Sequence, residues 1–223
     1  MFVKICANTN LEDALLAVEM GADAVGFVFA KGPRQVTADI VASITSKLPE
    51  SVERIGVFSD EQLEAIPSIV RAAGLNGVQL HGCYSEFVTK ALRAEFGPGL
   101  RIIQTNHWRV GGQVSTAFAA ELRTLSLAEE IDAVLVDSRT AVADGGTGIT
   151  FDWDAARSSL KELGDKPLIV AGGLNAGNVT QAVAILRPWG VDVASGVEAS
   201  PGKKDVEKLR AFIAAARAAA VPH

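Results

Sequence analysis

Cysteine is scarce in this sequence: the chain of 223 residues contains two, Cys6 and Cys83. Two isolated cysteines provide no disulfide framework, no CxxC motif and no zinc-ligand spacing. Long apolar runs are also missing from the sequence, since none approaches the roughly 20 consecutive apolar residues that a membrane-spanning helix needs. The N-terminal segment lacks the pattern of a signal peptide. These absences argue against a disulfide-rich secreted domain and against a membrane protein, and they predict a cytoplasmic location.

The charge balance is mildly acidic, with 21 lysines and arginines against 26 acidic residues and a formal net charge of −5. A net negative charge disfavours nucleic acid as the main partner, whereas a few local cations are enough to hold a small anion. Linkers and low-complexity segments are lacking, apart from a short alanine-rich stretch near the end of the sequence. Because 48% of the residues are hydrophobic, the chain can bury a sizeable core. We therefore expect one globular domain over residues 1–223.

A hidden repeat runs through the chain. Apolar, strand-like segments with Asp or Asn at their third position begin at residues 21, 74, 130 and 190, and they read "GADAVGFVF", "GLNGVQLHG", "EIDAVLVDS" and "GVDVASGVE". The intervals between them are too long for one strand plus one helix and suit two such units. The strands expected in between are "FVKIC", "ERIGVF", "RIIQT" and "PLIVAGG", at residues 2–6, 53–58, 101–105 and 167–173.

Helical periodicity separates these strands, for example in "LEDALLAVEM" and "VTQAVAILR". Eight short strands that alternate with helices indicate parallel pairing through right-handed crossovers. An open, doubly wound sheet would show the same alternation. Eight units in a chain of this length, with a repeat of two units, favour closure. The sequence therefore predicts an α/β fold, a single-domain (β/α)8 barrel of the TIM type.

The active site of such a barrel lies at the carboxyl ends of its strands. The residues at those ends include a thiol, an imidazole, an arginine and two carboxylates, namely Cys6, His81, Arg34, Asp137 and Asp192. Cys6 lies near a predicted helix start, which can favour the reactive thiolate, although most free cysteines are small buried apolar side chains. Asp137 follows the apolar run "AVLV". Apolar surroundings raise the pKa of a carboxyl group, although this residue could also be a cap or an ion-pair partner.

The first and sixth strands are well separated around an eight-stranded ring. Side chains at their ends, Cys6 and Asp137, can therefore flank a bound substrate from different sides. An acid on one side and a base on the other suit an isomerisation that moves a proton from one place to another.

Glycines mark the ends of the last two strands, in "AGGL" at residues 171–174 and "ASGVE" at residues 194–198. Small residues let backbone N–H groups approach a ligand, and barrels often hold a phosphate between these two loops. A Gly-Gly pair alone could merely make a tight turn, but two such loops at the two expected strands favour a phosphate. The predicted phosphate site comprises Gly172, Gly173, Ser195 and Gly196 of these loops. It also includes Gly146, from the glycine-rich segment after Asp137.

The ordered motifs resemble those of the phosphoribosylanthranilate isomerase family of tryptophan biosynthesis. The most specific are "GGTGITFDW" at residues 145–153 and "SGVEASPGKKD" at residues 195–205. "KIC", "GFVFAKGPRQV", "GVF", "VQLHG", "VLVDS" and "AGGLN" extend the resemblance over almost the whole chain. The sequence departs from the family pattern at Ala7, where the family has "KICG", and at Gly32 and Ile149.

The resemblance implies an Amadori rearrangement of the phosphosugar N-(5-phosphoribosyl)anthranilate to 1-(2-carboxyphenylamino)-1-deoxyribulose 5-phosphate, without a metal or an organic cofactor. On the matching positions, Asp137 would be the general acid, Cys6 the general base, and Arg34 the partner of the anthranilate carboxylate. His81 and Asp192 would line the substrate pocket, where each could instead be structural. The resemblance leaves open whether the chain is a monomer or a homodimer.

Two other functions stay open at this point. One is a histidine-pathway aminoaldose isomerase or a bifunctional version, but that chemistry is associated with two aspartates and two phosphate sites. The other is a non-catalytic barrel that binds phosphosugars, which would be expected to lack Cys6 or Asp137. The glycine-rich segment after Asp137 is expected to be a mobile loop that closes over the substrate, and Asp152 to cap the next helix.

Overall fold

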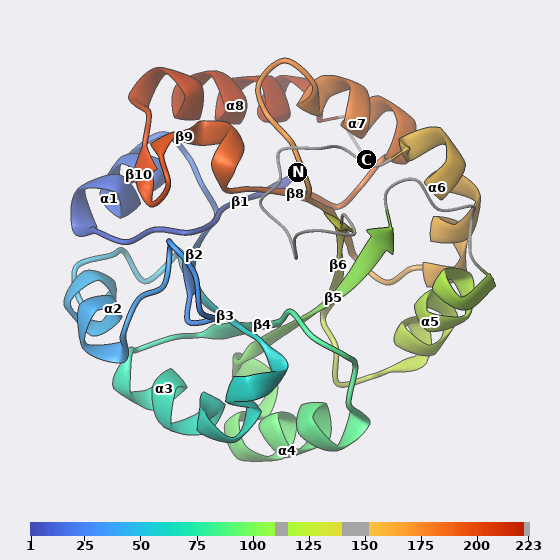
Figure 1. Cartoon of the computed structure of the whole chain (residues 1–223), viewed down its shortest axis with the longest axis horizontal. Coiled ribbons are helices and arrows are strands. Elements are labelled where there is room, and N and C mark those ends of the chain that lie inside the picture. Colours follow the sequence, from blue (N-terminus) through green and yellow to red (C-terminus); the bar gives the residue numbers. More distant parts are fainter. Residues whose placement is uncertain (110–115, 140–151, 221–223) are drawn as a thin grey trace.

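The computed structural model describes residues 1–109, 116–139 and 152–220. Strands and helices alternate along the chain, with the helices in a ring around the strands (Figure 1). The strands of the ring are β1 (Phe2–Ile5), β2 (Ala24–Val28), β3 (Glu53–Phe58), β4 (Gly77–Leu80), β5 (Arg101–Arg109), β6 (Ala133–Arg139), β7 (Leu168–Val170) and β8 (Gly190–Val193). The main helices are α1 (Leu11–Glu19), α2 (Ala38–Thr45), α3 (Ile66–Ala72), α4 (Glu86–Phe96), α5 (Thr116–Leu127), α6 (Trp153–Leu160), α7 (Val179–Leu186) and α8 (Val206–Ala219).

The sheet is closed. Each strand pairs in parallel with the next one along the chain, and β8 pairs in parallel with β1 through Phe2–Gly190 to Ile5–Val193. The last pairing excludes the open, doubly wound sheet and confirms the predicted (β/α)8 barrel. After β8 the chain adds a short 3-10 helix, η4 (Ser195–Val197), and a hairpin of β9 (Glu198–Ser200) and β10 (Lys203–Lys204).

Alternate strand residues face the helices and the barrel interior, because successive side chains of a strand point to opposite sides. On β1, Val3 and Ile5 pack into the large apolar cluster between strands and helices. Phe2 belongs instead to a smaller cluster inside the barrel, with Ile55 and Ile103 among its members. The same alternation places Lys4 and Cys6 on the interior side, above this apolar floor.

The polar third position of the sequence repeat ties neighbouring strands together in three of its four copies. In each of these copies a side-chain oxygen just before the strand accepts a hydrogen bond from the second backbone N–H of the preceding strand. The pairs are Asp23 with Val3 at 2.7 Å, Asn76 with Arg54 at 2.6 Å and Asp132 with Ile102 at 2.6 Å. The fourth copy differs, since β8 already begins at Gly190 and Asp192 lies inside the strand. That shift places a carboxylate in the barrel.

The expected elements are found with small differences at their ends. The side chain of Asp152 accepts a hydrogen bond from the backbone N–H of Ala155 at 2.9 Å, which confirms the predicted cap of α6. The fifth strand extends to Arg109 instead of ending at Thr105, because pairing with β6 continues over these residues. Within the described part of the chain, no helix combines the length and apolarity required to cross a membrane.

Ala7 has a left-handed backbone, with φ at 61°. This conformation costs a non-glycine residue roughly 1–2 kcal/mol. Replacement by glycine removes that cost but makes the unfolded chain more flexible, by about 0.4–1 kcal/mol. We expect Ala7→Gly to raise the free energy of unfolding by at most about 1.5 kcal/mol in urea titrations. As a control, Ala14→Gly within α1 should lower it by about 1 kcal/mol. Similar losses in both variants would contradict this account.

Candidate active site

A buried lysine lies at the centre of the side chains that the strands bring together. The Lys4 side chain is fully buried, and its Nζ donates to Oδ1 of Asp192 at 2.8 Å and to Oε1 of Gln79 at 2.9 Å. Gln79 in turn donates to Oγ1 of Thr105 at 3.2 Å. Burial alone would lower the pKa of Lys4, but the charges of Asp192 and Cys6 outweigh it and hold that pKa above its usual value. These neighbours favour the charged ammonium form of Lys4 inside the barrel.

Cys6 follows β1 and lies beside this ammonium. A Cβ atom built on Gly26 of β2 would lie 2.7 Å from Sγ of Cys6 and 3.2 Å from Nζ of Lys4. The thiol and the ammonium therefore lie next to each other, in the space beside β2 that a side chain at position 26 would fill. Cys6 continues the barrel ladder, since its N–H donates to the carbonyl of Val193 at 2.8 Å.

The pKa of the Cys6 thiol is raised above its ordinary value, mainly because the side chain is buried. The charge of Lys4 lowers this pKa, that of Asp192 raises it, and that of Lys204 lowers it, but burial prevails. The expectation that the position of Cys6 favours the thiolate in the ligand-free chain was therefore wrong. The helix that was expected to help begins only at Leu11.

Asp137 belongs to β6, and its side chain is buried in the upper part of the barrel. Burial is the main cause that raises its pKa to about 7, and the nearby carboxylate of Asp192 adds to the shift. A hydrogen bond from the backbone of Ser138 and the charge of Lys4 oppose it. The predicted effect of apolar surroundings on this carboxyl group is thus confirmed, with a second carboxylate as an additional cause. Near neutral pH the group can carry a proton.

Two histidines adjoin Asp137. The rings of His81 and His107 meet edge to face, with 4.6 Å between their centroids. Nε2 of His107 lies 3.1 Å from the carbonyl oxygen of His81 and must donate to it, since a carbonyl only accepts. Donor atoms of the two imidazoles and of Asp137 all lie within 4.8 Å of one another, so this set could hold a divalent metal ion. A metal there would compete with a proton for the carboxylate.

Arg34 lies in the loop after β2 and is anchored by Glu198, the first residue of β9. Nε of Arg34 is 3.0 Å from both carboxylate oxygens, and Nη2 is 2.7 Å from Oε2. Burial alone would raise the pKa of Glu198, but hydrogen bonds from Arg34 and the charge of Lys204 hold it below its usual value. Glu198 thus orients the guanidinium through the edge that carries Nε and Nη2. Nη1, on the other side, is not part of this ion pair.

Lys204 connects the hairpin to Cys6. Its buried Nζ donates to the carbonyl oxygen of Cys6 and lies 3.5 Å from Oε1 of Glu198. Burial lowers the pKa of Lys204, while the charge of Glu198 opposes this shift. The hairpin therefore fixes both Arg34 and the backbone of the residue that carries the thiol.

The two predicted phosphate loops lie against each other. A Cβ atom on Gly196 would come within 1.9 Å of the carbonyl oxygen of Leu174, so the loop after β8 touches the loop after β7. Gly172 and Gly173 have left-handed backbones, with φ at 82° and 64°. Ser195 and Gly196 belong to η4. Gly146 lies outside the described residues, as do the mobile loop expected after Asp137 and Ile149.

Gly172 also has a structural reason to be glycine. A Cβ atom there would lie 2.4 Å from Oγ of Ser138 and 2.8 Å from Oδ1 of Asp137. Any side chain at this position would displace the carboxyl group. The close packing of the segment after β7 against β6 is therefore sufficient to explain this glycine.

Sequence reasoning missed several polar residues of the site, namely Lys4, Gln79, His107, Glu198 and Lys204. Strand alternation places Lys4 and Cys6, two residues apart, on one face and could have indicated the lysine. His107 was missed because the fifth strand was expected to end at Thr105. No local signal pairs Glu198 with Arg34, since they are 164 positions apart.

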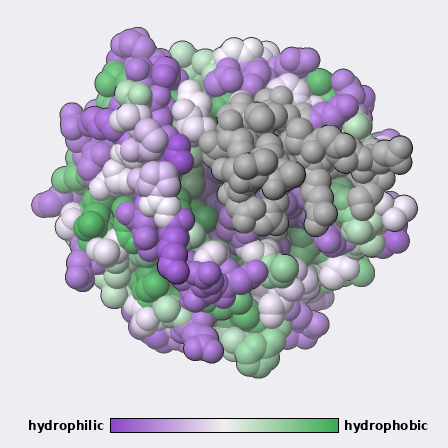
Figure 2. All heavy atoms as spheres, viewed as in Figure 1, coloured by the Kyte–Doolittle hydropathy of each residue, from purple (hydrophilic) through white to green (hydrophobic). Residues whose placement is uncertain are grey.

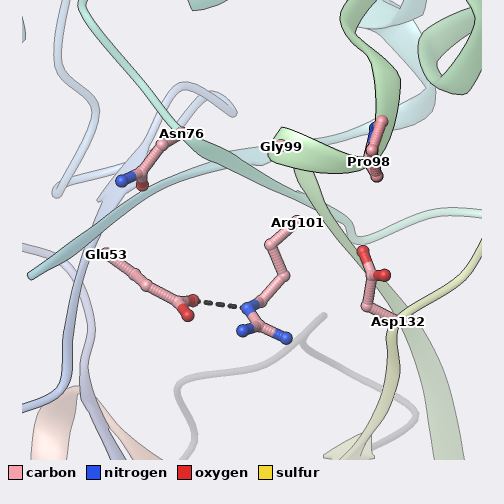
Figure 3. A pocket seen from close by; sticks show the side chains of 6 residues that line it. All are labelled: Glu53, Asn76, Pro98, Gly99, Arg101 and Asp132. Carbon is pink, nitrogen blue, oxygen red and sulfur yellow. Dashed lines mark hydrogen bonds and ion pairs between the residues drawn. The ribbon is translucent and has the colours of Figure 1, made fainter.

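A separate hollow of about 170 Å³ lies at the opposite end of the strands. It is lined by Glu53, Asn76, Pro98, Gly99, Arg101 and Asp132 (Figure 3). Nε of Arg101 donates to Glu53 at 2.6 Å, and Asp132 accepts from Arg93 at 2.8 Å. Because these charges are paired at the amino-terminal ends of the strands, the hollow serves barrel stability better than catalysis.

The face seen down the barrel carries many hydrophilic residues. Figure 2 shows a band of hydrophilic residues that reaches from the rim toward the middle of this face, with hydrophobic residues interspersed. Hydrophilic residues on this face, together with the buried charged groups, suit a polar or charged ligand better than an apolar one.

Comparison with known proteins gives one consistent result. Residues 3–215 match the model of the N-(5′-phosphoribosyl)anthranilate (PRA) isomerase family. The chain is 43% identical to the N-(5′-phosphoribosyl)anthranilate isomerase of Pelobacter propionicus over 216 residues, which cover 96% of this chain and 95% of the relative.

Solved structures of phosphoribosylanthranilate isomerases are also similar to this chain. A monomer generated from the dimeric phosphoribosylanthranilate isomerase of Thermotoga maritima is 35% identical, with a TM-score of 0.78 and coverage of 98% of this chain and 99% of that one. A phosphoribosylanthranilate isomerase in complex with reduced 1-(o-carboxyphenylamino)-1-deoxyribulose 5-phosphate is 34% identical, with a TM-score of 0.79 and the same coverage. This chain therefore belongs to the N-(5′-phosphoribosyl)anthranilate isomerase family.

Proposed function

We propose that this chain catalyses the Amadori rearrangement of N-(5′-phosphoribosyl)anthranilate to 1-(2-carboxyphenylamino)-1-deoxyribulose 5-phosphate, a step of tryptophan biosynthesis. The observation that carries this proposal is the pair of proton carriers on separate strands. Asp137 on β6 can hold a proton near neutrality, and Cys6 after β1 lies beside a buried ammonium. The family assignment supplies the substrate class.

In the proposed reaction Asp137 donates its proton to the ring oxygen of the ribose. The bond between C1′ and that oxygen breaks, and the lone pair of the substrate nitrogen forms a Schiff base. Cys6, as thiolate, then removes the proton from C2′, and the electron pair of the C–H bond neutralises the nitrogen to give an enolamine. Tautomerisation gives the ketone. The electron sink is the nitrogen of the substrate itself, so the proposed reaction uses no cofactor or metal.

This chemistry predicts an unusual pH profile. The reactive state has Asp137 protonated and Cys6 deprotonated, although the pKa of Asp137 is about 7 and that of Cys6 is higher. Below pH 7 the fraction in this state rises with pH, because more thiolate forms. Between the two pKa values it levels off, because each thiolate gained is offset by a proton lost from Asp137. We therefore expect kcat/KM to rise up to about pH 7, remain level, and fall above the pKa of Cys6. A rate that still rises steeply well above neutrality would contradict this assignment.

We assign the anthranilate carboxylate to Arg34, because Glu198 orients the guanidinium and leaves one side of it toward a ligand. Arg34→Ala should lower kcat/KM by roughly 10- to 100-fold, since charge-assisted hydrogen bonds contribute about 1.5–3 kcal/mol. The control is Lys31→Ala in the same loop, because the Lys31 side chain is 85% exposed and pairs with an exposed glutamate. Steady-state kinetics check both variants, and equal kcat/KM values for Arg34→Ala and Lys31→Ala would refute the assignment.

The remaining assignments follow the same reasoning. We propose that His81 and Asp192 line the substrate pocket and that the loops with Gly146, Gly172, Gly173, Ser195 and Gly196 hold the substrate phosphate. The two loops that carry the last four of these residues are in contact, which is what a shared anion site requires. We further propose a cytoplasmic enzyme that acts as a monomer or a homodimer, the Thermotoga maritima relative being dimeric.

The decisive experiment measures turnover of phosphoribosylanthranilate by the change in anthranilate fluorescence. The histidine-pathway aminoaldose is assayed beside it, at equal enzyme concentration. We expect turnover of the anthranilate compound and little or none of the other, because Cys6 stands where that other chemistry is associated with an aspartate. Turnover of the aminoaldose alone, or of neither substrate, would refute the proposed function.

A further inference from the structure

The Cys6 side chain can act as a base only as the thiolate, and the negative charge of a buried thiolate needs a stabilising partner. Cys6 is 6% exposed, and water can reach it only slightly. Six charged side chains surround it or its neighbours among the described residues. They are Lys4 on its own strand, Asp192 on β8, Asp137 on β6, Lys204 on β10, Arg34 in the loop after β2, and Glu198 on β9, which pairs with Arg34 and lies near Lys204.

Lys4 differs from the other cations in the partners of its charged group. The guanidinium of Arg34 pairs with Glu198, and Nζ of Lys204 donates to the carbonyl oxygen of Cys6 and lies near Glu198. Lys4 instead shares with the Cys6 sulfur the space that glycine keeps open at position 26. Oδ1 of Asp192 and Oε1 of Gln79 anchor its Nζ from two other strands. The ammonium therefore has a fixed place beside the sulfur.

A structural ion pair does not require this arrangement. A fully buried lysine costs free energy of desolvation, and an apolar pair of similar volume in its place is often neutral or stabilising. The interior cluster beneath Lys4, including Phe2, Ile55 and Ile103, is apolar and buried, so the barrel interior itself has no need of a charge. The position of the pair directly beside Cys6 and close to Asp137 gives it a use in the reaction.

We infer that Lys4 is a positioning residue of the active site, whose buried ammonium, anchored by Asp192 and Gln79, stabilises the thiolate of Cys6 when that residue acts as the base. This inference rests on the proposed function for its purpose, but the charge effect on Cys6 exists without substrate. Asp192 has the opposite effect on the thiolate, because it is a second negative charge. The pair thus sets how easily the thiol loses its proton.

The test is a direct titration of Cys6 without substrate. Ultraviolet absorbance of the thiolate is recorded against pH for each protein and for the same protein with Cys6→Ser, and the difference belongs to Cys6. Lys4→Met should move the midpoint to higher pH by about one unit or more, which is a tenfold loss of thiolate at a given pH. Asp192→Asn should move it to lower pH. A pair with a purely structural role would give shifts in the same direction in both variants, or none.

Lys4→Met leaves a buried carboxylate without its partner and can impair folding. The double variant Lys4→Met/Asp192→Asn removes both charges. The midpoint of the Cys6 titration in this double variant should still lie about one pH unit higher than in Asp192→Asn alone. Equal midpoints in these two proteins would overturn the inference. Because the titration needs no turnover, a chain that fails to isomerise phosphoribosylanthranilate but shows these shifts would refute the proposed function and not the role of Lys4.

Discussion

Replacing Asp137 with asparagine should reduce turnover of phosphoribosylanthranilate by about 10²–10⁴-fold, the usual contribution of a proton-transfer group. Asparagine keeps the shape of the side chain but has no carboxylic proton to donate to the ring oxygen. Binding of reduced 1-(o-carboxyphenylamino)-1-deoxyribulose 5-phosphate, the compound held by a related isomerase, should stay nearly normal. Calorimetric titration and turnover are measured on the same sample.

The stability of this variant provides an independent check. The pKa of Asp137 is about 7 in the folded chain, against an ordinary value of 3.8. The folded state therefore binds more protons than the unfolded state between these values, so the carboxyl group makes the free energy of unfolding fall as pH rises toward 7. Asp137→Asn removes this penalty and should be more stable than the wild type at pH 8, on the order of a few kcal/mol.

The two measurements separate a catalytic aspartate from a structural one. Lost turnover with retained binding and increased stability supports the general acid. Lost turnover together with lost binding and lower stability would show that Asp137 holds the barrel together, and the proposed mechanism would have to be withdrawn. Asp60→Asn is the matched control, because Asp60 is an exposed carboxylate that accepts a hydrogen bond from the backbone of Cys83 at the same rim.

Cys6→Ser should likewise remove most of the activity, by about 10²–10⁴-fold, because a serine hydroxyl does not ionise in the accessible pH range. The substitution is nearly isosteric, so the hydrogen bond from the backbone N–H of residue 6 to Val193 is kept. The product analogue should bind with nearly unchanged affinity. Turnover and calorimetric affinity, measured side by side, check this expectation.

The second free cysteine gives this experiment its control. Cys83 is exposed and lies in the loop after β4, so Cys83→Ser should leave turnover unchanged. If Cys6→Ser kept more than about a third of the wild-type rate, Cys6 would not be the base, since even a weak general base contributes far more than threefold. An equal loss in both serine variants would point to general damage by thiol removal.

Sequence alone predicted the alternation of strands and helices and the strands that carry the candidate site residues. The repeat with a polar third position predicted strands at the right places, and three of its four polar residues join neighbouring strands. Alternation and strand order are local properties of the chain, so they can be read without a structure. The apolar run before Asp137 likewise predicted a raised pKa for this carboxyl group, because residues next to Asp137 in the sequence form much of its surroundings.

Tertiary structure alone decided how the site is tuned. The ionisation of Cys6 depends on burial and on charges from β8 and β10, and its direction was opposite to the one expected from position in the sequence. Arg34 donates hydrogen bonds to Glu198, 164 positions away in the sequence, and Lys4 donates one to Asp192, 188 positions away. These contacts exist because closure of the barrel places the first and last strands side by side, and no periodicity in the sequence records which inward side chains then meet. Burial and long-range charge are properties of the closed ring, so only the folded chain fixes which group holds a proton.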